Sequence, residues 1–262
     1  MNWSVVPAGL FSILLSLNSF AEIDARVTLD AEKTAAKNFY PTAMLQRPFT
    51  LPTNSFETGI KLKASASQLA MNSLHLDYGI TNDFQIGVSW NGMSANHNFS
   101  DLTADQALSL NLGYFLFANH YAASMLAFSQ EFHLDNSRVA KSSSLSMPTS
   151  IPLVQGRLAL MTFNRDLIKM DWEKTVAEFN LPIKLNWQAT DRLYLTAETL
   201  LGKLSTDGNH THIFQQHDYW FQGLYAITPA IDVVAKTGYN SAPDSGFAFI
   251  AGINIRGGML DG

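Results

Sequence analysis

Three stretches of the chain repeat one pattern: Tyr78-Gly-Ile-Thr-Asn-Asp-Phe-Gln-Ile-Gly-Val88, Trp187-Gln-Ala-Thr-Asp-Arg-Leu-Tyr-Leu-Thr-Ala197 and Tyr225-Ala-Ile-Thr-Pro-Ala-Ile-Asp-Val-Val-Ala235. Each begins with an aromatic residue, has Thr three positions later, and passes through Asn, Asp, Pro or Arg into alternating apolar residues. This pattern is typical of a strand, a tight polar turn and a second strand. Because longer polar stretches separate the three hairpins, they indicate a membrane β-barrel with short turns at one rim.

Apolar and polar residues alternate from residue 56 to the end of the chain, and helical spacing does not fit. In residues 74–80, for example, the apolar residues are separated by His75, Asp77 and Gly79. We count about twelve strands, or ten if a short outer connection at 135–138 fails. The predicted strands are 56–65, 70–80, 83–93, 106–117, 121–133, 137–146, 151–163, 175–189, 192–204, 213–227, 231–241 and 246–257.

The parity of these strands orients the barrel. If the first strand runs outward from the periplasm, the repeated turns and those near 118–120 and 146–149 share one rim. The longer segments 91–105, 164–174, 205–212 and 240–245 then share the other. Short periplasmic turns opposite longer extracellular loops are typical of outer-membrane barrels. The predicted fold class is therefore all-β, a transmembrane antiparallel up-and-down β-barrel.

The residues before position 56 form two segments that are separate from the predicted barrel. Residues 1–21 contain an apolar run and end in Ser19-Phe20-Ala21, which is typical of a signal peptide cleaved before Glu22. Residues 22–55 are a periplasmic lead-in or a lumen plug, and we favour the lead-in because a helix this short is marginal alone. Residues 56–262 are the predicted barrel domain.

Aromatic residues support this orientation. Tyr78, Tyr114, Trp187 and Tyr225 each precede a predicted periplasmic turn on the apolar face, as expected of an aromatic girdle at a membrane interface. The candidates for the opposite girdle are Trp90, Phe132, Tyr239 and Phe247.

The polar face of the strands is predicted to line a lumen. It carries charges of both signs, whereas almost no ionisable residue falls on the apolar face, which suits lipid. A soluble secreted β-sandwich would bury the apolar face instead. The lumen-lining candidates are Glu57, Lys61, His75, Asp77, Arg157, Glu178, Lys184, Glu198, Asp232, Lys236 and Arg256.

Composition excludes some partners. The net charge is −5 and no basic run is present, so nucleic acid is not an expected partner. The chain has no cysteine, which removes disulfides and thiolate metal sites. No cofactor is predicted.

Enzyme and metal sites were weighed and are not predicted. No His has Ser two positions later, as a hydroxyl nucleophile activated on one strand face would need, and His133 with Asp135 lacks a second acidic pair. His210 and His212 are the one candidate for a metal site. We favour the alternative interpretation, in which they belong to a hydrophilic external loop. His75 with Asp77 is interpreted as a wall contact. Pro182 lies within a predicted strand, where it removes a ladder hydrogen bond. It indicates a bulge, a place where groups in the lumen replace the ladder, or a divided strand.

Residues 45–257 resemble a large group of Gram-negative outer-membrane barrels described as transporters or porin-like proteins. Arg47-Pro-Phe-Thr-Leu-Pro52 followed by Phe56-Glu-Thr-Gly-Ile-Lys-Leu62 is similar to the start of their first strand, and the Tyr78 turn is similar to their turns. Such barrels usually end in an aromatic residue, but this sequence ends Arg256-Gly-Gly-Met-Leu-Asp-Gly262.

The resemblance implies an outer-membrane location, with membrane lipids and the barrel assembly machinery as partners. The expected function is passive transport or binding of small solutes through the mixed-charge lumen. A non-conducting barrel in surface adhesion or partner binding is the main alternative. An outer-membrane hydrolase comes third, and the soluble sandwich comes fourth.

Overall fold

The computed structural model describes residues 41, 43–65, 68–96, 102–133, 140–206, 211–214, 218–240 and 246–258. The predicted signal peptide and most of the 22–55 segment lie outside these residues. Among the described residues, no helix has the length and apolar content needed to cross a bilayer.

The described chain is almost entirely β-strand, preceded by one turn of 3-10 helix, η3 (Met44–Gln46). The strands are β1 (Phe56–Ser65), β2 (Gln68–Thr81), β3 (Phe84–Asn96), β4 (Leu102–Ala118), β5 (Ala123–His133), β6 (Ser142–Ser146), β7 (Thr149–Val154), β8 (Leu158–Thr162), β9 (Ile168–Asp171), β10 (Val176–Gln188), β11 (Leu193–Thr206), β12 (Thr211–Phe214), β13 (Asp218–Thr228), β14 (Ile231–Asn240) and β15 (Gly246–Gly257).

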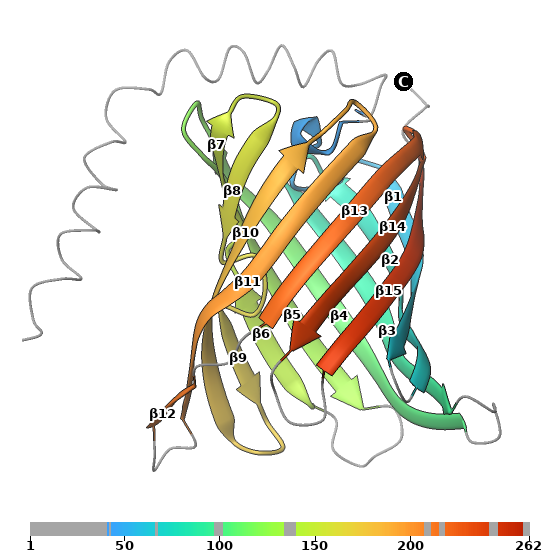
Figure 1. Ribbon diagram of the computed structural model, residues 1–262, viewed down its shortest axis with the longest axis vertical. Coiled ribbons are helices and arrows are strands. Elements are labelled where there is room, and N and C mark those ends of the chain that lie inside the picture. The colour runs from blue at the N-terminus through green and yellow to red at the C-terminus, as the bar shows by residue number, and fades with distance from the viewer. Residues whose placement is uncertain are drawn as a thin grey trace, which may run out of the picture.

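The strands close into one antiparallel barrel (Figure 1). Going round the wall, β10 is followed by β11, β13, β14, β15, β1, β2, β3, β4 and β5. Strand β5 then pairs with both β6 and β7. Strand β6 pairs with β9, and β7 pairs with β8. Strands β8 and β9 both pair with β10, which closes the ring. Three wall strands are interrupted and so appear as pairs, namely β6 with β7, β8 with β9, and β12 with β13. The barrel therefore has 12 wall strands, which confirms the predicted fold class and decides against ten.

The repeated motif forms the turns that the sequence predicted. The backbone N–H groups of Asp83, Arg192 and Ala230 donate to the hydroxyls of Thr81, Thr190 and Thr228 at 3.2, 3.3 and 3.2 Å. Each Thr therefore binds the N–H group two residues later, which fixes the reversal locally. This shared bond explains why Thr recurs at the same position.

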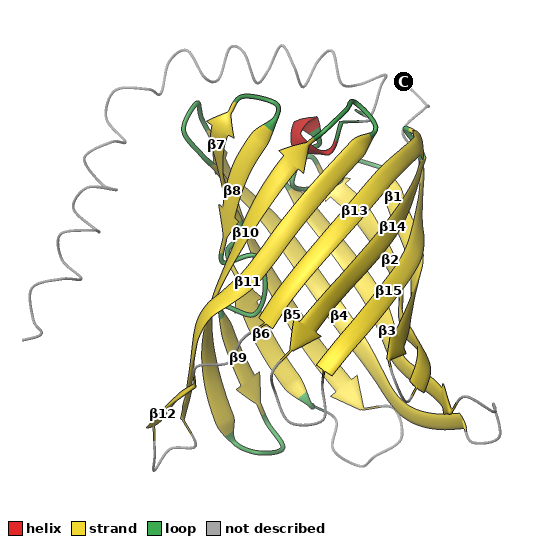
Figure 2. Ribbon diagram, in the orientation of Figure 1, coloured by secondary structure: helices red, strands yellow, loops and turns green. Residues whose placement is uncertain are grey.

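All three turns lie at one end of the barrel, which we call the turn rim and which is uppermost in Figures 1 and 2; the opposite end is the loop rim. The connection at 119–122 lies at the turn rim, as predicted. On the loop rim, β3, β4 and β11 extend into residues predicted as loops.

One predicted hairpin is wrong. The turn expected at 146–149 is a break within a single wall strand, and the reversal lies at residues 155–157. Pro148 lacks the N–H group that a ladder needs, so the sequence resembles a turn, but the chain continues in the same direction. Gly156 instead supplies the reversal, with a φ of 67°. The outer connection expected at 164–174 accordingly lies at 172–175.

The outer wall is apolar, because the side chains that point away from the lumen are mostly Leu, Val, Ile and aromatics. Water would not solvate such a continuous apolar surface favourably, whereas lipid does. Exposed members from strands around the ring include Leu76, Val88, Leu110, Phe128, Leu185, Phe221, Val233, Phe249 and Ile255. This surface identifies a transmembrane barrel.

Candidate functional site in the barrel lumen

The inward face of the strands is polar and charged. Along β10, for example, Asn186 and Gln188 are buried while their neighbours Leu185 and Trp187 are exposed to the outside. Most of the sequence-predicted lumen residues lie on this inward face: Glu57, Lys61, His75, Asp77, Glu178, Lys184, Glu198, Asp232, Lys236 and Arg256.

Arg157 is the exception, because it lies exposed in the β7–β8 turn. It was placed in the lumen only because residues 151–163 were predicted to be one strand. The corrected turn at 155–157 moves it to the turn rim.

The aromatic residues predicted as a girdle are exposed on the outer face near the turn rim: Tyr78, Tyr114, Trp187 and Tyr225. Near the loop rim, Tyr239 and Phe247 pack together with ring centroids 5.1 Å apart, and both are exposed. These placements suit rings at two membrane interfaces.

A buried charge network lies in the lumen close to the turn rim. Asp232, fully buried on β14, accepts from Arg47 at 2.5 and 2.9 Å and from Arg256 of β15 at 2.5 Å. The Arg256 guanidinium also contacts Glu57 of β1 at 2.5 Å. The carboxylates of Asp232 and Glu57 together balance the charges of the two arginines, which is what allows the charges to be buried.

Arg47 belongs to residues 43–55, which we call the mouth segment. The backbone N–H of Leu45 donates to Gln188 of β10 at 3.2 Å, and that of Leu51 donates to Gln85 of β3 at 2.9 Å. The Thr50 hydroxyl donates to the carbonyl of Asn82 at 2.6 Å. Figure 2 shows its helix η3, in red, at the turn rim. The segment thus bonds to strands on well-separated parts of the wall.

Gly79 provides the surface on which the mouth segment rests. Its carbonyl accepts from Asn54 at 2.8 Å, and its N–H donates to Ser55 at 2.9 Å. A methyl group at this position would collide with the carbonyl oxygen of Pro52 and would lie 2.6 Å from that of Leu51. Glycine is required here by the close approach of another backbone.

We therefore expect Gly79→Ala to lower the free energy of unfolding by about 1–3 kcal/mol, as overpacking does. Urea unfolding of the refolded protein in detergent measures this. Gly202→Ala is the matched control, because a methyl group there meets no atom within 4 Å. Equal urea midpoints for the two variants would contradict the docking of the mouth segment.

The wall is also irregular where β8 and β9 are separated and the adjacent β10 has a register shift. Residues 163–167 separate β8 from β9, and Phe163 and Asp166 there have positive φ values of 53° and 41°. On the adjacent β10, the pairing to β11 shifts between Asn180 and Pro182. Pro182 has no backbone N–H group to donate to a neighbouring strand, and it lies opposite the gap between β8 and β9. The bulge predicted at Pro182 is thus present.

The break carries Arg165 across the lumen. Its guanidinium passes over β10 and contacts Glu198 of β11 at 3.1 Å and Asp218 of β13. Asn180 of β10 anchors the segment, since its amide donates to the carbonyl of Asp166 at 2.9 Å. We call residues 163–167 the inner segment. It forms a charged bridge across one side of the channel.

Further cations surround this bridge. The ammonium group of Lys236 lies 4.0 Å from Glu198 and 4.6 Å from the centre of the Trp220 ring. Toward the loop rim, Lys203 pairs with Glu178 at 2.7 Å. Lys203, Glu178 and Arg165 border a polar cavity, whose other lining residues are Asp166, Lys169, Asn180, Leu200 and Asp218.

The wall formed by β3 to β6 is different, because neutral polar groups replace charges over much of its length. Its charged pair, Glu131 of β5 with Lys141 at 3.9 Å, lies toward the loop rim. The Ser129 hydroxyl donates to Asn111 at 2.7 Å, and the Asn111 amide donates to Ser89 at 3.3 Å. Ser144 and Ser146 of β6 border a cavity beside these residues. The lumen therefore has a charged side and a hydroxyl-rich side.

Sequence reasoning missed Arg47 and Arg165. Arg47 fell in the predicted lead-in, and Arg165 fell in a predicted extracellular loop. The lumen position of each arginine is revealed only by its long-range contacts. Local signals were nevertheless present: two prolines follow Arg47 in the sequence, and Pro182 faces the segment that carries Arg165. Of the remaining candidates, His210, Asp135 and the side chain of His212 lie outside the described residues, while His133 pairs with Glu173 at 3.0 Å.

No family model matches the chain, and no curated protein matches it. Solved structures do. The KdgM porin matches with a TM-score of 0.53 and 8% identity over 76% of this chain and 98% of the porin. The KdgM porin in complex with disordered oligogalacturonate gives a TM-score of 0.54 at 7% identity over the same shares.

The COG4313 outer membrane channel from Pseudomonas putida F1 gives a TM-score of 0.50 at 12% identity, over 79% of this chain and 97% of the channel. The fold is that of a porin-like outer-membrane barrel. At these identities the likeness concerns the fold alone, so the lumen of this chain must be interpreted from its own residues.

Proposed function

We propose that this protein is a passive channel for small hydrophilic solutes in an outer membrane. The observation that carries the proposal is the closed wall, which is apolar outside and lined inside by charged and hydroxyl groups. The apolar surface supports membrane insertion, and the polar interior supports a water-filled path. The turn rim would then face the periplasm, where the mouth segment enters.

The lumen supports weak selection by charge. Arg165, Lys236 and Lys184 stand close to Glu198 and Asp218, so cations and anions each meet a partner there. Hydroxyl groups of the opposite wall offer hydrogen bonds without charge. This combination suits small polar solutes that carry several hydrogen-bonding groups.

Planar-bilayer recording of the refolded full-length protein tests the proposal. We expect discrete conductance steps in potassium chloride, with a reversal potential close to zero in a salt gradient, because both signs of charge line the path. Heat-modified gel mobility confirms that the recorded sample is folded. A folded protein that inserts into the bilayer and carries no current would contradict the channel.

A non-conducting barrel is the second candidate, and the docking of the mouth segment favours it. Arg47→Gln tests whether this segment closes the path, because the substitution removes the charged link to Asp232. A silent native protein with a conducting Arg47→Gln variant would indicate a channel closed by its own N-terminal segment. Silence of both proteins would favour a filled barrel that acts through its loops.

A further inference from the structure

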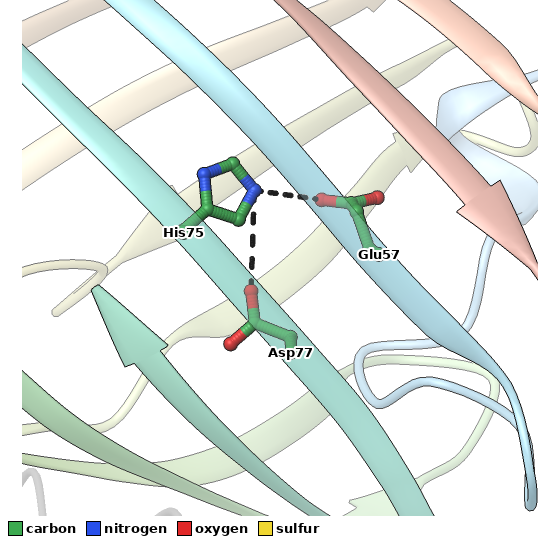
Figure 3. A group of neighbouring side chains, drawn as sticks. All are labelled: Glu57, His75 and Asp77. Carbon is green, nitrogen blue, oxygen red and sulfur yellow. Dashed lines mark ion pairs between the residues drawn. The ribbon is translucent and has the colours of Figure 1, made fainter. Parts of the chain in front are cut away.

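Three side chains with metal-binding donor atoms converge on the lumen wall near the turn rim (Figure 3). Glu57 projects from β1, and His75 and Asp77 project from β2. Register brings them together, because Glu57 lies directly opposite Asp77, and His75 follows on the same face of β2. One donor atom from each residue lies within 4.8 Å of the other two.

The separations are too long for hydrogen bonds. The Nε2 atom of His75 is 3.6 Å from Oε1 of Glu57 and 4.0 Å from Oδ2 of Asp77. Hydrogen bonds from nitrogen to oxygen are about 2.7–3.2 Å long. Two ligands that each lie about 2.1 Å from one tetrahedral ion are roughly 3.4 Å apart. The donor atoms therefore stand at ion-pair distances, which also suit ligands around one shared ion.

The surroundings hold this arrangement in place. Arg256 binds the other carboxylate oxygen of Glu57 at 2.5 Å, which leaves Oε1 directed at His75. Orientation of a ligating carboxylate by a second group is usual at metal sites. The neighbouring inward positions on β1 and β3 are Gly59 and Gly87, where a methyl group would collide with His75 and Asp77 respectively. The absence of side chains there leaves room for the three donor groups.

Asn254 of β15 adds a fourth donor atom, an amide oxygen, to the patch. It pairs across the sheet with Gly59, and its amide oxygen would lie beside a methyl group at that glycine, as would the imidazole of His75. This oxygen is buried and has no hydrogen-bond partner among the described residues. A buried acceptor without a partner is rare and is satisfied when a cation occupies the space beside it.

We propose that Glu57, His75 and Asp77 bind one divalent transition-metal ion on the lumen wall. Two carboxylates and an imidazole suit a first-row transition-metal cation such as Zn²⁺, whereas Mg²⁺ favours oxygen ligands and retains its water. The two carboxylates supply two negative charges, and Arg256, which is shared with Asp232, offsets part of that charge. The site would therefore attract a divalent cation without burying an unbalanced carboxylate pair.

Isothermal titration of the refolded full-length protein with Zn²⁺ tests this proposal. The starting protein is the His210→Ala/His212→Ala variant, which removes the alternative metal candidate. We expect one Zn²⁺ per chain and much weaker binding of Mg²⁺. His75→Ala and Asp77→Asn, each introduced into this background, should each weaken Zn²⁺ binding by at least about tenfold, since both remove a ligand.

His120→Ala is the matched control, because His120 is exposed in the 119–122 turn away from the cluster. It should leave Zn²⁺ binding unchanged. Gel mobility identifies a variant that fails to fold, in which case the other ligand substitution decides. Unchanged Zn²⁺ affinity in a folded His75→Ala or Asp77→Asn variant would overturn the site, as would the loss of all stoichiometric binding in the starting variant.

Discussion

Asp232→Asn is expected to lower the free energy of unfolding by about 3–5 kcal/mol, the range found when one partner of a buried ion pair is removed. Asp232 is fully buried and binds both Arg47 and Arg256. Without its charge, the two guanidinium groups lose the carboxylate that binds both of them. Urea unfolding in detergent, followed by gel mobility, measures the loss.

Asp191→Asn is the control, since Asp191 is exposed in the 189–192 turn at the same rim. It should change the free energy of unfolding by less than about 0.5 kcal/mol. The double variant Asp232→Asn/Arg47→Gln should lose less than the sum of its single variants, because the second change removes the cation whose charge Asp232 balances. Additive losses would show that Arg47 and Asp232 do not act as a pair.

The wall of this barrel was predictable from local pattern. Lipid on one side and a polar lumen on the other force residues to alternate, so strand after strand could be recognised by period two. In the repeated turns, each Thr bonds to the backbone only two residues later, so the sequence shows this feature directly. Pro148 misled the prediction because a missing N–H group looks the same at a turn and at a break.

The interior was less predictable, because its partners lie far apart in the chain. Arg47 and Asp232 are separated by 185 residues, and Arg165 and Asp218 by 53. No periodicity marks such pairs. The inward positions of the residues could be inferred from strand parity, but which cation meets which carboxylate depends on closure of the ring. The cluster of His75, Asp77 and Glu57 is an example. The sequence shows that His75 and Asp77 share one face of a strand, but Glu57 lies beside them only because of the pairing register between β1 and β2.

Arg165→Ala is expected to make the channel more selective for cations. Arg165 contacts both Glu198 and Asp218, so its removal leaves two carboxylates facing the path. One unit charge at about 6 Å in water changes the energy of an ion by about 0.7 kcal/mol, which is roughly threefold in local cation concentration. The local Cl⁻ concentration falls by the same factor, so we expect the permeability ratio of K⁺ to Cl⁻ to rise by about tenfold, measured from the reversal potential in a salt gradient.

Arg157→Ala is the matched control for this prediction. It removes the same charge from the exposed β7–β8 turn, where the side chain borders no part of the inner bridge. The bulk and charge of Arg165 also occupy the lumen, so single-channel conductance should increase with Arg165→Ala and not with Arg157→Ala. Identical reversal potentials for the two variants would show that ions do not pass the inner segment. The conducting path would then have to run along the hydroxyl-rich wall, where Ser129 and Asn111 would replace the charges as the groups that solutes meet.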